Sequence, residues 1–204
     1  MALFGAPFKK ADDADRALSV ANEMLVMLGA LNRRRSARGE APIDIGVGIA
    51  TGDVIAGNIG SPTRVDYTVI GDSVNVASRL EGANKLYRTR ILLDATTRAS
   101  LKNPGILREI DLLQVWGKDH PVAVYESLGY LAGAPGLDAM IACFEHGLSA
   151  YRARDWQRAI GCFDEALALR PEDEPSRIYI DRCRAYAQAP PPDDWRGIWV
   201  LSEK

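Results

Sequence analysis

Long apolar runs and a cysteine framework are both missing from this chain of 204 residues. No stretch of 18 or more apolar residues occurs, and the N-terminus lacks the charged, apolar and small-residue succession of a signal peptide. The cysteines, Cys143, Cys162 and Cys183, are odd in number and form no CxxC pair, so they indicate neither a disulfide framework nor a zinc site. We therefore expect a soluble segment in a reducing cytoplasm.

A strong net charge is missing as well. The 25 Lys and Arg residues nearly balance 27 Asp and Glu residues, which gives a formal charge of -2 and predicts no nucleic-acid or anionic-membrane partner. The densest basic run falls at the end of a predicted helix, where cations complement the helix dipole and are solvated. Its members are Arg33, Arg34, Arg35 and Arg38.

Hydrophobic periodicity divides the first 128 residues into strands and helices. We expect the end of a strand and a turn at 1–7, a long amphipathic helix at 12–35, strands at 43–49 and 54–59 around a turn at 51–53, a strand at 67–70, a helix capped by Gly71 and Asp72, a buried strand at 91–93, a helix at 95–102, and a strand pair at 106–115 and 122–125. In the strand at 43–49, Gly46 and Gly48 alternate with apolar residues, which indicates a close approach on one face. Hairpins and crossing helices together predict an α+β sandwich.

Asn75 and Arg79 lie four residues apart on the helix that begins after Gly71. Residues at i and i+4 share one face of a helix, so these two side chains would act as one polar site. An amide donates and accepts hydrogen bonds, and a guanidinium presents a planar charged fork that fits phosphate. The pair suits a phosphorylated, polyhydroxy ligand, although a helix start with solvated polar side chains is an alternative interpretation.

The segments around this pair form an ordered set of motifs. They are MALFGAP at 1–7, IDIGVGIATGDVIAGNIGS at 43–61, RVDYTVIGD at 64–72, VNVASRLE at 74–81 and VWGKDHPVAVYE at 115–126. Together they resemble the class III adenylate/guanylate cyclase catalytic domain, from residue 1 to about residue 126. The resemblance implies a ferredoxin-like, cyclase-type sheet with packed helices over residues 1–128. It also implies conversion of ATP to cyclic AMP and pyrophosphate in intracellular signalling.

The resemblance also assigns roles to single residues. Asn75 would orient the ribose, and Arg79 would stabilise the charge that develops at the α-phosphate. Thr68 occupies the purine-reading position, where a hydroxyl favours adenine over guanine, although a β-branched residue is equally ordinary in a strand. Trp116 stands where relatives carry the first lysine of VKGK, so Lys118 is left either to bind phosphate or to serve as a turn residue.

Members of this family use two Mg²⁺ or Mn²⁺ ions held by two aspartates. By the resemblance, those aspartates precede the position matching Met1, so the chain is expected to lack its metal ligands. We expect it to be a segment of a longer cyclase or an open reading frame begun at an internal Met. Asp12, Asp13 and Asp15 open the first helix, where acidic side chains are expected without a metal. We therefore interpret them as helix-start residues.

The family's active site forms at a dimer interface, with metals from one protomer and the Asn and Arg from the other. The resemblance therefore implies a homo- or heterodimer in which this chain supplies the ribose and transition-state half. Without metal ligands, we expect the chain to be inactive alone.

The composition changes after residue 128, where small and helix-breaking residues mark a linker at 129–137. Residues 138–188 then carry Gly147, Trp156, Ala159, Phe163, Ala166 and Pro171 at offsets that resemble one tetratricopeptide repeat, an α-helical hairpin, followed by a further helix. One repeat buries its face poorly, so this module must pack on the cyclase-like part, on itself or on a protein partner. The Pro- and Trp-rich tail at 189–204 is interpreted as a docking strip.

Two alternatives to an enzyme follow from the same residues. The first is an inactive regulatory or protein-interaction protein that uses the cyclase-like dimer surface and the helical module. Trp116 and the absent metal ligands favour it, whereas Asn75, Arg79 and Thr68 favour the enzyme. The second, a generic nucleotide-binding domain, is weaker because no P-loop or Rossmann fingerprint follows a strand.

Overall fold

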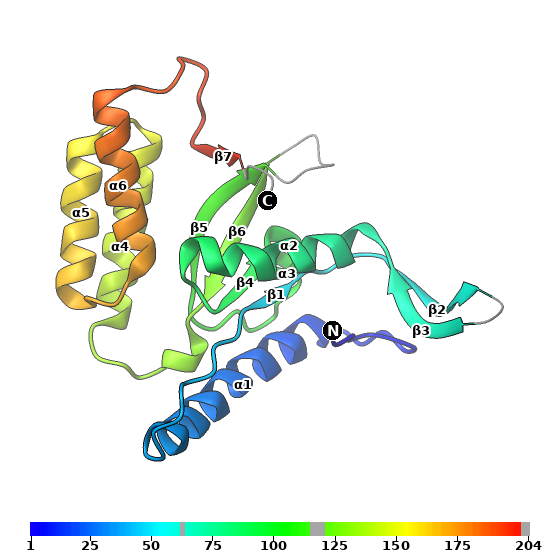
Figure 1. Cartoon of the computed structure of the whole chain (residues 1–204). Coiled ribbons are helices and arrows are strands. Elements are labelled where there is room, and N and C mark those ends of the chain that lie inside the picture. The colour runs from blue at the N-terminus through cyan, green and yellow to red at the C-terminus, as the bar shows by residue number, and fades with distance from the viewer. Residues whose placement is uncertain (62–63, 115–120, 201–204) are drawn as a thin grey trace.

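The computed structural model describes residues 1–61, 64–114 and 121–200. Its larger sheet has five strands in the order β1-β4-β6-β5-β7, and β2 and β3 form a separate two-stranded sheet. The elements are α1 (Asp13–Ser36), β1 (Val47–Ile49), β2 (Ile55–Ser61), β3 (Arg64–Ile70), α2 (Asp72–Tyr87), β4 (Ile91–Asp94), α3 (Ala95–Ser100), β5 (Leu107–Gln114), β6 (Val122–Ser127), a 3-10 turn η1 (Gly129–Leu131), α4 (Leu137–Arg152), α5 (Trp156–Leu169), α6 (Glu174–Gln188) and β7 (Ile198–Val200). The α+β class is confirmed (Figure 1).

The central strand β4 shows how helices cover both faces of the sheet. Ile91 and Leu93 point to one face and pack with α1, whereas Leu92 points to the other face and packs with α2 and the C-terminal helices. All three side chains are fully buried. A strand covered on both faces reads as a continuous apolar run, which is why the sequence predicted this one well.

Helix α1 follows directly from its amphipathic pattern. Leu18, Ala21 and Leu25 form its buried stripe, acidic residues occupy its first turn, and Arg33, Arg34 and Arg35 occupy its last. Arg33 and Arg34 are exposed, as expected for a solvated helix end. None of the helices in the described ranges is long and apolar enough to cross a membrane.

The expected pairing of strands around residues 51–53 is wrong. The first strand is only Val47–Ile49, and it pairs in parallel with β4, while β2 pairs antiparallel with β3. Periodicity identifies a strand but not its partner, which depends on contacts distant in sequence. The strand end expected at residues 1–7 is also absent, because residues 1–12 form no strand.

The β2–β3 hairpin projects away from the rest of the molecule and leads directly into α2 (Figure 1). Gly71 and Asp72 were expected to cap this helix together. Gly71 alone is the N-cap, so no side chain caps the helix start. Asp72 is instead the first helical residue, where its carboxylate lies in the positive field of the helix start.

Helices α4, α5 and α6 pack together as three neighbours, as predicted for the C-terminal region. The small residue Gly147 permits the close approach of α4 and α5, because a Cβ there would lie 2.7 Å from Cε1 of Phe163. Ala159 and Phe163 are fully buried between the helices. The small and aromatic residues selected in the sequence therefore pack as expected.

The tail returns from these helices to the sheet. Trp195 packs edge-on against Tyr151 with ring centroids 5.2 Å apart, and it also contacts Trp156 and Tyr186. Strand β7 then pairs in parallel with β5. The tail therefore docks within the chain. It joins the end of α6 to the sheet, and the three helices α4–α6 are called the helical group below.

A buried ion cluster joins the helical group to the sheet. Arg108 on β5 donates to Glu126 on β6 at 2.8 Å and forms two hydrogen bonds with Asp173, the N-cap of α6, at 2.6 and 3.0 Å. Asp173 also accepts from the backbone and hydroxyl of Ser176. Because charges buried without partners are costly, this cluster fixes the position at which α6 starts relative to the sheet.

Candidate active site

Helix α2 presents Asn75 and Arg79 on its exposed side. Both side chains are exposed, whereas Val76, Leu80 and Ala83 are buried against the sheet. The rise of 1.5 Å per residue places Asn75 and Arg79 about 6 Å apart along the helix axis. The structure therefore brings the amide and the guanidinium together on an accessible helix face.

Close backbone contact between α2 and β1 fixes the position of this face. A Cβ on Gly48 would lie 2.1 Å from the carbonyl oxygen of Ala77 and 2.4 Å from the backbone nitrogen of Glu81. No side chain larger than hydrogen fits at that distance, so the glycine-containing face expected from the strand pattern is confirmed.

Asn84 supplies a polar tie between the same elements, and the sequence reasoning missed it. Its buried amide donates to the carbonyl oxygen of Val47 at 3.1 Å, and its side-chain oxygen accepts from the hydroxyl of Thr89 at 3.0 Å. A buried amide with several partners restricts how a helix can rotate or slide. The only signal in the sequence was an asparagine at a helix position that faces the core.

The start of α2 is held by the loop that follows β1. A Cβ on Gly71 would lie 2.8 Å from the carbonyl oxygen of Asp53, and a Cβ on Gly52 would lie 2.9 Å from Cβ of Ser73. These glycines allow the loop and the helix start to touch. Asn75 is therefore held from both sides, by the loop at its N-terminal end and by β1 beneath the following turns.

Thr68 lies on β3, just before the junction with α2 at Gly71. It is half-buried and pairs across the hairpin with Gly57. Thr68 and Asn75 thus flank one chain corner, where a strand gives way to a helix. The other two positions of interest, Trp116 and Lys118, lie outside the described residues.

The hairpin also carries an uncovered apolar pair. Ile55 and Ile70 face each other across β2 and β3, and they are 74% and 55% exposed. Large aliphatic side chains at this exposure lose hydrophobic stabilisation unless another surface covers them. Ile70 lies two residues before α2, so the pair sits at the end of the hairpin that joins this helix.

The acidic residues at the start of α1 have protein contacts of their own. Asp13 accepts from the backbone of Lys10 and pairs with Arg16, and Asp15 accepts from the backbone of Asn103 at 2.8 Å. Asp12 is the N-cap position without a side-chain cap bond. In the described ranges, no group of three or more His, Cys, Asp or Glu side chains could hold a metal ion.

Asp15 makes the stability of the α1 contact dependent on pH. Hydrogen bonds from the backbone of Asn103 and Lys102 lower the pKa of Asp15 below its ordinary value of 3.8. Since the native pKa is the lower one, this stabilisation is present above the unfolded pKa of about 4 and is lost as the pH falls through the native value.

We expect Asp15→Asn to lower the melting temperature at pH 7 and the difference from the native sequence to shrink below about pH 4. Thermal unfolding at pH 7, 5 and 3 measures this. Glu23→Gln on the same helix is a suitable control, because Glu23 is exposed and its carboxylate accepts from the nearby Ser19 hydroxyl. A difference that stays constant across the pH range would contradict the assignment.

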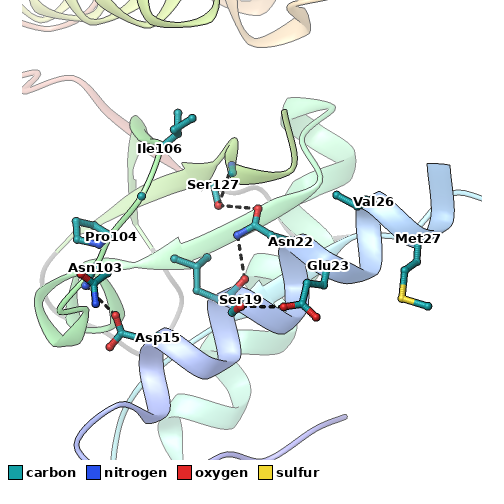
Figure 2. A pocket seen from close by; sticks show the side chains of 13 residues that line it. Asp15, Ser19, Asn22, Glu23, Val26, Met27, Asn103, Pro104, Ile106 and Ser127 are labelled. Carbon is teal, nitrogen blue, oxygen red and sulfur yellow. Dashed lines mark hydrogen bonds between the residues drawn. The ribbon is translucent and has the colours of Figure 1, made fainter. Parts of the chain in front are cut away.

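A groove lies elsewhere, between α1 and the segment that leads into β5. It has a volume of about 570 Å³. Figure 2 shows Asp15, Ser19 and Asn22 along its α1 side and Asn103 and Ser127 opposite them. Thr68, Asn75 and Arg79 do not line it. Ser19 pairs with Glu23, and Asn22 accepts from Ser127 at 3.1 Å, so these polar groups support packing.

Comparison with known sequences matches the first part of this chain to cyclases. The model of the adenylate and guanylate cyclase catalytic domain matches residues 1–125. The terminal-differentiation specific adenylate cyclase of Dictyostelium discoideum is 33% identical over 146 residues, which cover 69% of this chain and 7% of that protein. The adenylate cyclase of Anabaena cylindrica is 40% identical over 121 residues, 56% of this chain and 24% of that protein. This chain therefore spans a small part of these relatives.

Solved structures agree with the sequence matches. The adenylyl cyclase CyaB from P. aeruginosa superposes with a TM-score of 0.54 and 34% identity, covering 60% of this chain and 63% of that one. The guanylyl cyclase Cya2 gives a TM-score of 0.53 and 33% identity over 64% and 66% of the two chains. With the family match extending over more than half of its length, this chain belongs to the adenylate and guanylate cyclase catalytic domain family.

Proposed function

We propose that this chain contributes the ribose-orienting and transition-state-stabilising half of an ATP cyclase site at a dimer interface, producing cyclic AMP and pyrophosphate. The exposed Asn75 and Arg79 pair on a helix held by Gly48 carries the proposal. A functional group is most effective when its supporting backbone is fixed, because its orientation then costs little free energy during the reaction. The relatives named as adenylate cyclases support the choice of reaction.

The two side chains suit different parts of the substrate. The Asn75 amide can donate to and accept from ribose groups, which would orient the 3'-hydroxyl towards the α-phosphate. The Arg79 guanidinium can stabilise the charge that grows on the α-phosphate as pyrophosphate departs. Thr68, at the chain corner beside them, can accept from the adenine amino group.

A second cyclase protomer would complete this half-site. The exposed Ile55 and Ile70 on the projecting hairpin give an apolar surface next to the proposed site, as expected of a region covered on association. In the family's arrangement, with the site shared between two protomers, the Mg²⁺ or Mn²⁺ ligands would come from that second protomer. The chain alone is then expected to be inactive with ATP.

The test combines this chain with a cyclase protomer that retains its metal-binding aspartates but carries inactivating changes at its own Asn and Arg. Cyclic AMP formation from ATP is expected only in the mixture. Arg79→Ala in this chain is expected to lower turnover by about 10²–10³-fold, the effect of removing one preorganised transition-state donor. Lys85→Ala is the matched control, because Lys85 is an exposed cation on the same helix.

Three outcomes would contradict the proposal. One is cyclic AMP formation by this chain alone that Arg79→Ala abolishes. The second is an inactive mixture although the protomers demonstrably associate, and the third is an equal loss of activity from Lys85→Ala. Substituting GTP for ATP tests the role of Thr68, since adenine recognition predicts a preference for ATP.

We further propose that α4 and α5 form one tetratricopeptide-like repeat within a separate region at 138–188, preceded by a linker at 129–137 and followed by the tail at 189–204. The contact of Gly147 with Phe163 and the burial of Ala159 support this interpretation. The 138–188 region contacts the sheet of its own chain at the start of α6, where Asp173 pairs with Arg108 of β5. This internal docking favours a structural role for the repeat, and protein partners would bind its remaining exposed faces.

A further inference from the structure

Arg182 on α6 joins three elements of the chain at one buried point. Its guanidinium donates to Oδ2 of Asp111 on β5 at 2.6 Å and lies 3.5 Å from the hydroxyl of Tyr87, the last residue of α2. The Tyr87 hydroxyl donates to the same Asp111 oxygen at 2.6 Å. Tyr87 is fully buried, and Asp111 and Arg182 are 1% and 7% exposed.

Aromatic rings enclose the guanidinium. It lies 3.7 Å from the ring centroid of Trp199 on β7, 5.0 Å from that of Tyr179 on α6 and 5.4 Å from that of Tyr87. A delocalised cation among ring faces is stabilised without water, so Arg182 can remain charged at this depth. The helical group and the tail together therefore build the environment that holds the end of α2.

A bulge in β5 orients the side chain of Asp111 towards Arg182. The pairing of β5 with β6 shifts register between Glu109 and Asp111, and such a bulge redirects a side chain. The second oxygen of Asp111 accepts from the backbone nitrogen of Leu112 at 2.8 Å. Both oxygens of this carboxylate therefore accept hydrogen bonds within the chain, and Oδ2 accepts from both Tyr87 and Arg182.

Fixing Tyr87 also fixes the face that carries Asn75 and Arg79. An α-helix is stiff, so setting the rotation of its last turn sets the rotation of turns about 12 and 18 Å away, the positions of Arg79 and Asn75. Gly48 contacts the helix backbone at Ala77 and Glu81, and Asn84 ties the next turn to β1, so Tyr87 adds the restraint on the final residue of the helix. Burial raises the pKa of the Tyr87 hydroxyl, with the Asp111 charge adding to the effect, so the hydroxyl stays protonated as a donor.

We infer that Arg182 is a positioning residue for the cyclase reaction, acting from the C-terminal helical group through Tyr87 and Asp111 to set the orientation of the Asn75 and Arg79 face. The inference rests on the proposed function for its effect on turnover. Its structural part, that α6 restrains α2, does not depend on that function. The helical group then serves as a built-in support of the active-site helix.

Amide hydrogen exchange of the unmixed chain tests the structural part. Tyr87→Phe keeps the ring and removes the hydroxyl, and we expect exchange along α2 to rise about three- to tenfold, as for loss of one buried hydrogen bond. Arg182→Met should raise it by tenfold or more, because Asp111 then lacks a charged partner. Arg182→Lys, which restores the charge without the planar fork, should fall between Arg182→Met and the native chain.

Exchange along α1 is the internal reference, because α1 packs on the opposite face of the sheet with a separate core cluster. The inference requires the increase in α2 to exceed that in α1. Faster exchange in α6 and β7 with unchanged α2 would overturn it, and so would an equal rise everywhere in all three variants. Arg184→Met is the matched control, since Arg184 is an exposed cation on the same helix.

Turnover in the mixed-protomer assay tests the functional part. Tyr87→Phe is expected to lower kcat about three- to tenfold while KM for ATP changes less than kcat, because misorientation affects the transition state more than binding. Arg184→Met should leave both values unchanged. Native kcat in Tyr87→Phe and Arg182→Met would overturn the inference. An inactive native mixture refutes the proposed function instead, and the exchange data still decide whether α6 restrains α2.

Discussion

Replacing Arg108 with methionine is expected to lower the free energy of unfolding by about 3–5 kcal/mol, the usual cost of breaking a buried ion pair from one side. Methionine fills similar space but leaves Glu126 and Asp173 without their cation, at 3% and 7% exposure. The Phe144 ring also loses the guanidinium that lies 4.4 Å from its centroid. Chemical denaturation monitored by tryptophan fluorescence measures the change.

The destabilisation by Arg108→Met is expected to depend on pH. Complete burial raises the pKa of Glu126, and Arg108 opposes this rise. Without Arg108, the pKa of Glu126 rises further, so a modest fall in pH neutralises the buried carboxyl and removes part of its cost. The difference in unfolding free energy between variant and native chain should therefore be smaller at pH 5 than at pH 8.

Arg177→Met is the control for this effect. Arg177 pairs with Glu174 on α6, the helix that Asp173 caps, but both of these side chains are nearly half exposed. An exposed pair contributes about 0–1 kcal/mol, so its loss should be small and nearly independent of pH between 5 and 8. Similar losses from Arg108→Met and Arg177→Met would show that the buried cluster does not fix the helical group on the sheet.

Gly48→Ala is expected to displace α2 and to lower stability by about 1–3 kcal/mol, the range for inserting atoms into a filled interior. The added methyl would meet the backbone of α2 at Ala77 and Glu81, and backbone atoms cannot move aside by changing rotamer. The helix must shift as a unit, which also moves Asn75 and Arg79. In the mixed-protomer assay, the variant should lose most turnover at temperatures where it remains folded.

Gly82→Ala provides the opposite result on the same helix. Apart from its chain neighbours and the helix's own backbone, no atom of the described residues lies within 4 Å of a Cβ built at Gly82, so alanine fits there without strain. Replacing a glycine inside a helix with alanine should raise stability by about 0.5–1 kcal/mol. Equal stability losses at Gly48 and Gly82, measured by chemical denaturation, would show that helix composition and not contact with β1 determines the effect.

The candidate site was predictable to different extents at different residues. Asn75 and Arg79 were identified from their spacing, because side chains four apart must share a helix face wherever the helix lies. Gly48 was identified by the strand alternation. Asn84, Tyr87 and Arg182 gave no usable local signal, because their partners lie 37, 24 and 71 residues away in the sequence.

The sequence by itself determined the helices, most strand positions and the chemistry carried by α2, since these depend on periodicity and residue type within a few turns. Only the tertiary structure decided that β1 pairs with β4, that β2 and β3 form a projecting hairpin, and that α6 reaches the end of α2. Strand pairing and helix docking are selected by contacts between distant segments, which compete for the same apolar faces. For this chain, local pattern therefore specified the helix that carries Asn75 and Arg79, and long-range packing specified how that helix is held.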